Sequence, residues 1–156
     1  MDSSNPFEEG QDPKDLPPAR DAATLVLLRE RAEGPPEYLM MRRAQSMEFA
    51  GGALVFPGGA VDADDHAHAR QIELGALNVA EAAVRICAIS ETLEEAGVLI
   101  GAGNVATAVT AEMRQALNAG TPFSQLCRHA GVVLDVTMLV PFARWLPNFR
   151  SHRRYD

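Results

Sequence analysis

The part of this 156-residue chain that most constrains its fold is the stretch 78–97, which has the pattern of one long amphipathic helix. Asn78 is a typical helix N-cap, Glu81 follows it at capping-box spacing, and Gly97 is a typical C-terminal stop. Two stripes run along this helix: an apolar one, Ile86, Ile89 and Leu93, and an acidic one, Glu91, Glu94 and Glu95. The sequence therefore predicts a helix of about five turns with one buried side and one carboxylate side.

The acidic stripe has two interpretations. Like charges at these spacings cost an isolated helix about 0.2–0.5 kcal/mol per pair, and bound divalent cations would compensate for them. Carboxylate oxygens suit Mg²⁺ or Mn²⁺, which bridge phosphate oxygens, activate a water molecule and neutralise charge developing on phosphorus. The alternative is a solvated acidic surface near a helix C-terminus, which is the commoner meaning of a short ExxEE match. The pattern of the acids alone leaves both interpretations open.

Short apolar runs and a glycine pair precede the helix. Residues 53–56 are typical of a short strand, and this strand leads directly into Gly58 and Gly59. Two earlier apolar runs, residues 23–28 and 38–41, are separated by a turn-forming Gly-Pro-Pro sequence and predict a hairpin. We expect the third strand to deliver the glycine loop to a functional site.

Two smaller groups are candidates for a site. Arg42 and Arg43 stand at the end of the second apolar run, where guanidinium groups would contact substrate phosphates, although paired arginines at a strand end are more often solvated. His66 and His68 lie in an acidic segment, but an isolated HxH pair is weak as a metal site, so a polar loop is expected there. We keep the two arginines as candidate substrate-binding residues.

The rest of the chain predicts two helices and a strand. Residues 110–118 and 122–130 each end just before a glycine, which indicates two short capped helices. Residues 132–145 are apolar and partly β-branched, so a later strand is expected there. An aromatic residue in such a strand is usually part of the core, which is the place we expect for Phe142 and Trp145.

Composition excludes several classes of protein. A formal net charge of -7 argues against non-specific binding to nucleic acid or to an anionic membrane. Cys87 and Cys127 have no metal or redox spacing, so both are expected to be reduced core residues. Residues 1–20 are acidic and rich in proline, and we expect a disordered lead there, with no signal peptide, ahead of a single domain over residues 21–156. These features favour a cytoplasmic protein.

Taken together and in order, the glycine pair and the acidic helix resemble the Nudix box. Phe56-Pro57-Gly58-Gly59 comes first, the three glutamates follow, and Gly97-Val98 closes the motif as it does in that family. Residues 46–52 before the box, residues 140–145 after it and the long insertion over residues 66–89 resemble one subgroup of the family. That subgroup includes peroxisomal coenzyme A diphosphatases and bacterial homologues. The resemblance covers approximately residues 20–155.

The resemblance implies an α/β fold of the Nudix kind, an α/β/α sandwich around a mixed sheet. The residues to which it gives roles are Glu91, Glu94 and Glu95 for catalysis and metal binding, Asp65 for metal binding, and Gly58 and Gly59 for substrate binding. The implied reaction is Mg²⁺- or Mn²⁺-dependent hydrolysis of a nucleoside-diphosphate-linked small molecule, with coenzyme A or acyl-CoA favoured. ADP-ribose or a sugar nucleotide is the alternative substrate. A catalytically impaired or truncated nucleotide-binding module of the same fold is the other alternative, and a homodimer is compatible with each of these.

The chain departs from the family pattern in three positions or segments and stops early relative to it. Asp65 stands where the family has a longer loop glutamate, and Ser90 stands where it has an arginine that holds a catalytic glutamate by an ion pair. The insertion makes the box about 17 residues longer than the short family pattern. Family members continue beyond a stretch like residues 153–156, so we expect a sheet that lacks its last strand and closing helices.

Overall fold

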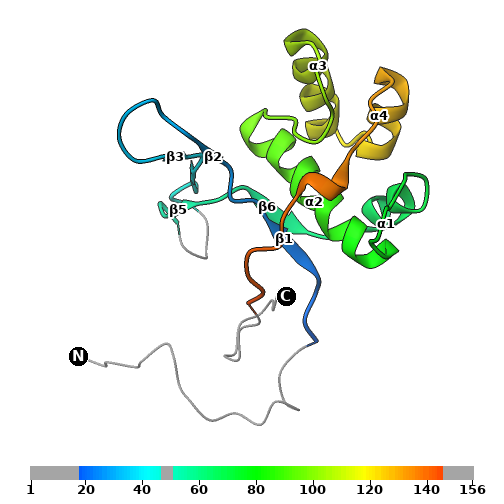
Figure 1. Cartoon of the computed structure of the whole chain (residues 1–156), viewed down its shortest axis with the longest axis horizontal. Helices are drawn as coiled ribbons and strands as arrows, with labels where there is room; N and C mark the ends of the chain where they lie inside the picture. Colours follow the sequence, from blue (N-terminus) through cyan, green and yellow to red (C-terminus); the bar gives the residue numbers. More distant parts are fainter. Residues whose placement is uncertain (1–17, 47–50, 146–156) are drawn as a thin grey trace.

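The computed structural model describes residues 18–46 and 51–145, and Figure 1 shows their arrangement. The strands are β1 (Ala22–Thr24), β2 (Leu28–Arg29), β3 (Glu37–Tyr38), β4 (Met41–Arg42), β5 (Leu54–Val55) and β6 (Gly58–Ala60). The helices are α1 (Ala63–Ala69), α2 (Val79–Ala96), α3 (Thr107–Asn118) and α4 (Phe123–Ala130), followed by a 3-10 turn over Val136–Met138. Most of the expected disordered lead lies outside the described residues, as do residues 47–50 and 146–156 of the segments that resemble the Nudix subgroup.

The strands form three short antiparallel pairs. β1 pairs with β6, β2 with β3, and β4 with β5. The helices gather on one side of β1 and β6, while the β2–β3 hairpin extends away from them (Figure 1). The described residues contain antiparallel pairs alone, so the parallel part of a mixed sheet is not seen among them.

The predicted hairpin is present only in part. Leu28 and Arg29 pair with Tyr38 and Glu37 as expected, but the beginning of the same run forms β1 and pairs with the glycine strand β6. A Cβ atom built on Gly58 would come within 2.2 Å of the Ala23 carbonyl oxygen. The close approach of β1 and β6 therefore depends on glycine, which a search for alternating apolar residues does not detect.

Helix α2 agrees closely with the prediction. The Asn78 side chain accepts a hydrogen bond from the Glu81 N–H at 3.0 Å, and the Glu81 carboxylate accepts one from the Asn78 N–H at 2.9 Å. Gly97 ends the helix with φ of 73°, a left-handed conformation that glycine adopts without the strain of a side chain. These local signals, read from the sequence, were enough to place both ends of the helix.

The core is built around α2. Its predicted apolar stripe, Ile86, Ile89 and Leu93, is fully buried, and it packs with residues of α1, α3, α4 and the 3-10 turn. The opposite side, at Cys87 and Ala88, packs against Ala23 of β1. Both cysteines are buried and free, as predicted. No helix in the described part of the chain is long and apolar enough to cross a bilayer.

The polar loop expected at His66 and His68 is wrong, because these residues lie in α1. Asp62 caps this helix and exchanges side chain to backbone hydrogen bonds with Asp65 at 2.9 and 3.0 Å, an aspartate version of the capping box. His68 is buried, and its ring lies edge-on to Phe123 with 5.8 Å between the ring centres. The insertion therefore contributes a packed helix to the domain.

The strand expected over residues 132–145 is also wrong. The Val132 N–H donates to the Cys127 carbonyl at 2.8 Å, and the Arg85 guanidinium donates to the carbonyls of Val136 and Leu139 at 2.9 and 2.6 Å. These backbone groups are satisfied by a helix end and by a side chain, so they have no need of a neighbouring strand.

The expected core positions of Phe142 and Trp145 are wrong as well. The side chain of Phe142 is 92% exposed and that of Trp145 is 70% exposed. Both residues follow the 3-10 turn and Pro141 in a stretch without strand structure, so the alternation of buried and exposed side chains in a strand does not apply to them.

Asp64 links α1 to α4, and its removal should measure the strength of that link. Its carboxylate accepts hydrogen bonds from the backbone N–H of Ser124 at 2.9 Å and from the Ser124 hydroxyl. Asp64→Ala leaves both buried donors unpaired, so we expect the free energy of unfolding to fall by about 1–2 kcal/mol in urea denaturation. Glu73→Ala, at an exposed acid, should change it by less than about 0.5 kcal/mol. Equal effects of the two substitutions would contradict the assigned link.

Candidate active site

Three side chains spaced by four residues on α2 face the glycine strand β6. The Cys87 thiol donates to the Gly59 carbonyl at 3.5 Å, and the Glu91 carboxylate lies directly against Gly59. The Glu95 carboxylate accepts a hydrogen bond from the Gly58 N–H at 2.9 Å. Because residues four apart share one side of a helix, a single stripe of α2 carries all three contacts.

The fit between Gly59 and Glu91 is so close that a side chain at position 59 would force the Glu91 carboxylate to move. A Cβ atom built on Gly59 would stand 2.1 Å from Glu91 Oε1 and 2.3 Å from its carboxyl carbon. The predicted glycine loop and the predicted carboxylate helix thus meet in the structure. Among the residues given roles by the sequence, Gly58, Gly59, Glu91 and Glu95 are brought together.

Glu91 lies in an unfavourable environment for a negative charge. The pKa of its carboxyl is raised to about 7, chiefly by burial and then by the negative charges of Glu95, Glu94 and Asp65, in that order. A half-buried carboxylate among other acids is a group that a cation would stabilise in its charged form. The electrostatics of this stripe therefore fit a bound divalent ion.

Asp65 is buried beside the same stripe, but its carboxylate already has a structural role. Its Oδ2 accepts the Asp62 N–H at 3.0 Å within the capping box of α1. Burial raises the pKa of the Asp65 carboxyl to about 7, with smaller contributions from the charges of Asp62 and Asp64. Asp65 therefore belongs to the acidic environment of Glu91, as the effect of its charge on the pKa of Glu91 indicates.

The acidic residues are close in the sequence, and their charges affect one another, but their side chains do not surround a common point. In residues 18–46 and 51–145, no three His, Cys, Asp or Glu side chains converge closely enough to hold a metal ion. Glu95 is turned to a backbone N–H, and Glu94 lies one position around the helix from the stripe that faces β6. The donor chemistry fits Mg²⁺ or Mn²⁺, since carboxylate oxygens are the ligands that these ions prefer.

The structure does not join the two candidate arginines to the glutamates. Arg42 is exposed on β4, where it pairs with Leu54 of β5. The backbone of Arg43 bonds to Ala53 and Gly52, and its Nε is buried without a hydrogen-bond partner. No hydrogen bond or ion pair in the described part of the chain links either arginine to the acidic stripe.

Two residues at the site carried no clear signal in the sequence. Arg114 of α3 donates to the backbone carbonyls of Glu94 and Glu95 at 2.9 and 2.7 Å, a contact across about 20 positions that no local pattern indicates. Cys87 was expected in the core. Its spacing of four from Glu91 is the signal that could have placed it on the stripe that faces β6. Burial raises the pKa of its thiol, which remains protonated and able to donate.

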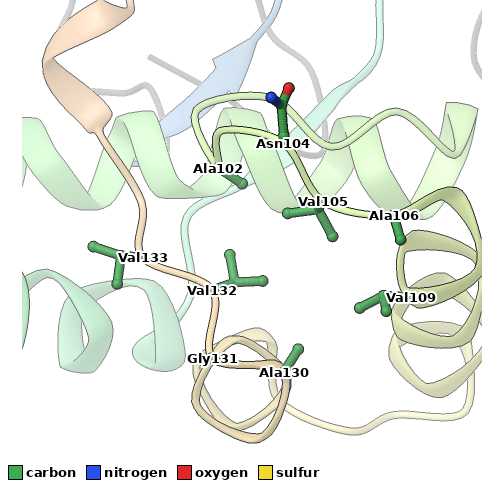
Figure 2. Close-up of a pocket in the computed structure, with 9 residues that line it drawn as sticks. All are labelled: Ala102, Asn104, Val105, Ala106, Val109, Ala130, Gly131, Val132 and Val133. Atoms are coloured by element: carbon green, nitrogen blue, oxygen red, sulfur yellow. The ribbon is translucent and has the colours of Figure 1, made fainter.

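A separate hollow of about 380 Å³ lies between the loop before α3, the start of α3 and the end of α4 (Figure 2). Its lining is Ala102, Asn104, Val105, Ala106, Val109, Ala130, Gly131, Val132 and Val133. The side chains of Val105, Val109 and Val132 point toward one another across it (Figure 2). It contains no acidic or basic side chain, so it lacks the groups that phosphate chemistry requires.

Comparison with known proteins identifies relatives of the whole domain. The sequence model of the NUDT19 Nudix domain matches residues 67–156. Acyl-coenzyme A diphosphatase NUDT19 of Gallus gallus is 29% identical over an alignment 179 positions long, which covers 79% of this chain and 47% of that protein. The chain thus spans about half the length of this curated relative.

A solved structure supports the same relationship at the level of the fold. The crystal structure of a NUDIX hydrolase from Alicyclobacillus acidocaldarius aligns with a TM-score of 0.67 at 28% identity. The alignment covers 89% of this chain and 67% of that one. This likeness confirms the α/β fold class predicted from the sequence.

The contact between Gly59 and Glu91 can be tested with a double-mutant cycle. Gly59→Ala should lower the free energy of unfolding by about 1–3 kcal/mol, because its Cβ cannot occupy the space of the Glu91 carboxylate. In a Glu91→Ala background the same substitution should cost at least about 1 kcal/mol less, since the obstructing group is gone. A Glu112→Ala background, with the acid removed from the exposed side of α3, should give no such relief. Strict additivity with Glu91→Ala would contradict the contact.

The raised pKa of Glu91 predicts a pH dependence of stability without metal. In the unfolded chain a glutamate ionises near its ordinary value of 4.5, whereas in the folded chain Glu91 retains its proton up to about 7. The free energy of unfolding should therefore fall as pH rises from about 4.5 to about 7 and then level off.

Glu91→Gln imitates the protonated side chain and removes this penalty. In chelator it should stabilise the protein by about 1 kcal/mol at pH 8, a value reduced for solvent screening, and have little effect at pH 4. Glu112→Gln serves as the matched control, with no pH-dependent gain. Urea denaturation at both pH values measures the difference, and a gain for Glu91→Gln that is the same at pH 4 and pH 8 would oppose the assignment.

Proposed function

Because the chain belongs to the Nudix hydrolase family, we propose that it hydrolyses the diphosphate bond of a nucleoside-diphosphate-linked small molecule. The observation that carries the proposal is the close contact of Gly58 and Gly59 with the Glu91 and Glu95 carboxylates. It places a glycine strand, without side chains at its first two positions, beside acids of the kind that bind divalent ions. Both halves of the motif are thus adjacent in the folded chain.

The proposed metal ligands are Glu91, Glu94 and Glu95, with Asp65 as a fourth acid. Mg²⁺ or Mn²⁺ bound there would supply positive charge to phosphate oxygens and lower the pKa of a bound water. Repulsion among these carboxylates, which contributes to the raised pKa of Glu91, supports a cation-binding role. The Asp65 carboxylate is engaged with the Asp62 N–H, so its contribution is that of a buried supporting charge.

The chain's own groups have distinct parts in this proposal. A carboxylate of the stripe orients the attacking water and accepts its proton, and the raised pKa of Glu91 makes its carboxylate a stronger base than an ordinary glutamate. Gly58 and Gly59 present backbone rather than side chains, which allows a phosphate group to approach closely. Arg42 and Arg43 are retained as proposed contacts to more distant substrate phosphates: Arg42 is exposed on β4, and Arg43, which follows it, is half-buried with no hydrogen-bond partner at Nε.

Coenzyme A or an acyl-CoA is the proposed substrate. The relative from Gallus gallus, which is 29% identical to the chain, is named an acyl-coenzyme A diphosphatase. The segments around the box that resemble the coenzyme A subgroup favour the same substrate. A homodimer and a cytoplasmic location remain predictions from the sequence.

One observation favours a second candidate function, a nucleotide-binding module without turnover. Ser90 stands in place of the expected arginine, and its hydroxyl donates to the Cys87 carbonyl at 3.1 Å within the helix. It therefore makes no contact of the kind by which an arginine would hold a catalytic glutamate. The acids also do not form a cage in the described residues.

Assay of the purified chain tests the proposal. With coenzyme A and Mg²⁺ or Mn²⁺, we expect release of adenosine 3',5'-bisphosphate and phosphopantetheine, resolved by chromatography, and no release in chelator. Glu91→Gln, Glu94→Gln and Glu95→Gln should each lower kcat/KM by on the order of 100-fold or more, because each removes a negative ligand oxygen.

Controls separate the alternatives. Glu112→Gln, an acid lost from α3, should retain full activity. AMP released from ADP-ribose, without coenzyme A cleavage, would change the substrate but keep the reaction. A folded protein that binds nucleotide and cleaves neither compound would support the module without turnover.

A further inference from the structure

The C-terminal end of α2 is stabilised by a residue of another helix. In an α-helix the last carbonyls have no partner within the helix. In α2 the Leu93 carbonyl is bonded by the Gly97 N–H at 2.9 Å, while the carbonyls of Glu94 and Glu95 are bonded by the Arg114 side chain of α3. Nε of Arg114 donates to the first and Nη2 to the second, so one guanidinium bridges two consecutive peptide groups.

This end of the helix is electrostatically unfavourable without Arg114. The carbonyl end of a helix carries a partial negative charge, and acidic side chains there are destabilising. The last turn of α2 contains Glu94 and Glu95 and no basic residue. Arg114 therefore supplies the positive group that the last turn of α2 lacks.

Gly97 provides the space that this contact needs. A Cβ atom at position 97 would stand 3.1 Å from Nη1 of Arg114 and 3.4 Å from its Cδ, tighter than an ordinary contact. The residue before Arg114, Met113, is buried in the core with Leu93. The guanidinium is thus carried by a helix that packs into the core, and the absence of a Cβ at position 97 leaves space beside its Nη1.

We propose that Arg114 is the positioning residue for the Glu94 and Glu95 pair. Ser90, which stands where the family has an arginine that holds a catalytic glutamate, does not have this role. The inference rests on the proposed metal-binding function of these glutamates. By fixing the peptide groups at Glu94 and Glu95, Arg114 holds the directions of both Cα–Cβ bonds, that of Glu95 toward β6 and that of Glu94 one position around the helix from it. Loss of that constraint lets the last turn fray and weakens the carboxylate site without any change to the carboxylates themselves.

Manganese binding by the full chain tests the inference, with Mn²⁺ alone as the probe and calorimetry or electron paramagnetic resonance as the measurement. Arg114→Met retains the aliphatic length and removes the donors, and it should weaken Mn²⁺ binding by about tenfold or more, the usual cost of losing a group that orients metal ligands. Arg114→Lys retains a positive donor and should restore part of the affinity.

Hydrogen exchange at the Gly97 amide should accelerate in Arg114→Met, while exchange at the Ala82 amide, in the first turn of α2, stays slow.

Arg85, which lies on α2 itself, offers a matched control. It also donates to two backbone carbonyls, those of Val136 and Leu139, but it lies away from the acidic stripe. Arg85→Met should lower stability to a similar degree and leave Mn²⁺ affinity unchanged. Equal Mn²⁺ affinities for Arg114→Met and Arg85→Met, or unchanged exchange at Gly97, would overturn the inference.

Two further outcomes are decisive. If circular dichroism shows that Arg114→Met does not fold, Arg114→Lys and Arg85→Lys are compared in place of the two methionine variants. A loss of Mn²⁺ affinity in Arg114→Lys alone supports the inference. An equal loss of Mn²⁺ affinity in both lysine variants opposes it. Absence of Mn²⁺ binding by the folded, unsubstituted chain would overturn the proposed function and this inference with it.

Discussion

The structure of the site depends on the contact between two glycines and one stripe of α2. Cys87, Glu91 and Glu95 recur every four residues, and each meets the backbone of Gly58 or Gly59. Because position 59 has no Cβ, the strand lies close enough for a carboxylate to rest against a peptide group. The short β1–β6 pair and the packing of α2 on β1 lie directly beside this contact.

Helix α2 is held at both ends, by different means. At its start, Asn78 and Glu81 satisfy each other's backbone donors, a local arrangement. At its end, Gly97 reverses the chain, and Arg114 satisfies carbonyls from another helix. A helix that is fixed in this way presents its acids in a constant direction, which a site for phosphate chemistry requires.

The features that the sequence predicted are those encoded locally. The two ends of α2, its buried stripe and its acidic stripe follow from spacing and from the capping residues, and the structure has them all. One kind of error arises where the interaction partner lies far away in the sequence. Nothing near residues 132–145 indicates that Arg85, about 50 positions earlier, bonds their carbonyls in place of a strand. The α1 capping box was missed because aspartate stands at the position where glutamate or glutamine is usual.

The central claim is that the carboxylate stripe facing Gly58 and Gly59 is a divalent cation site. The most direct measurement is anomalous diffraction at the manganese edge from crystals of the chain grown with Mn²⁺. The account predicts an anomalous peak bound by oxygens of Glu91, Glu94 and Glu95, on the side of α2 that faces β6. Manganese bound only at another place on the protein, with Glu95 still on the Gly58 N–H, would contradict it.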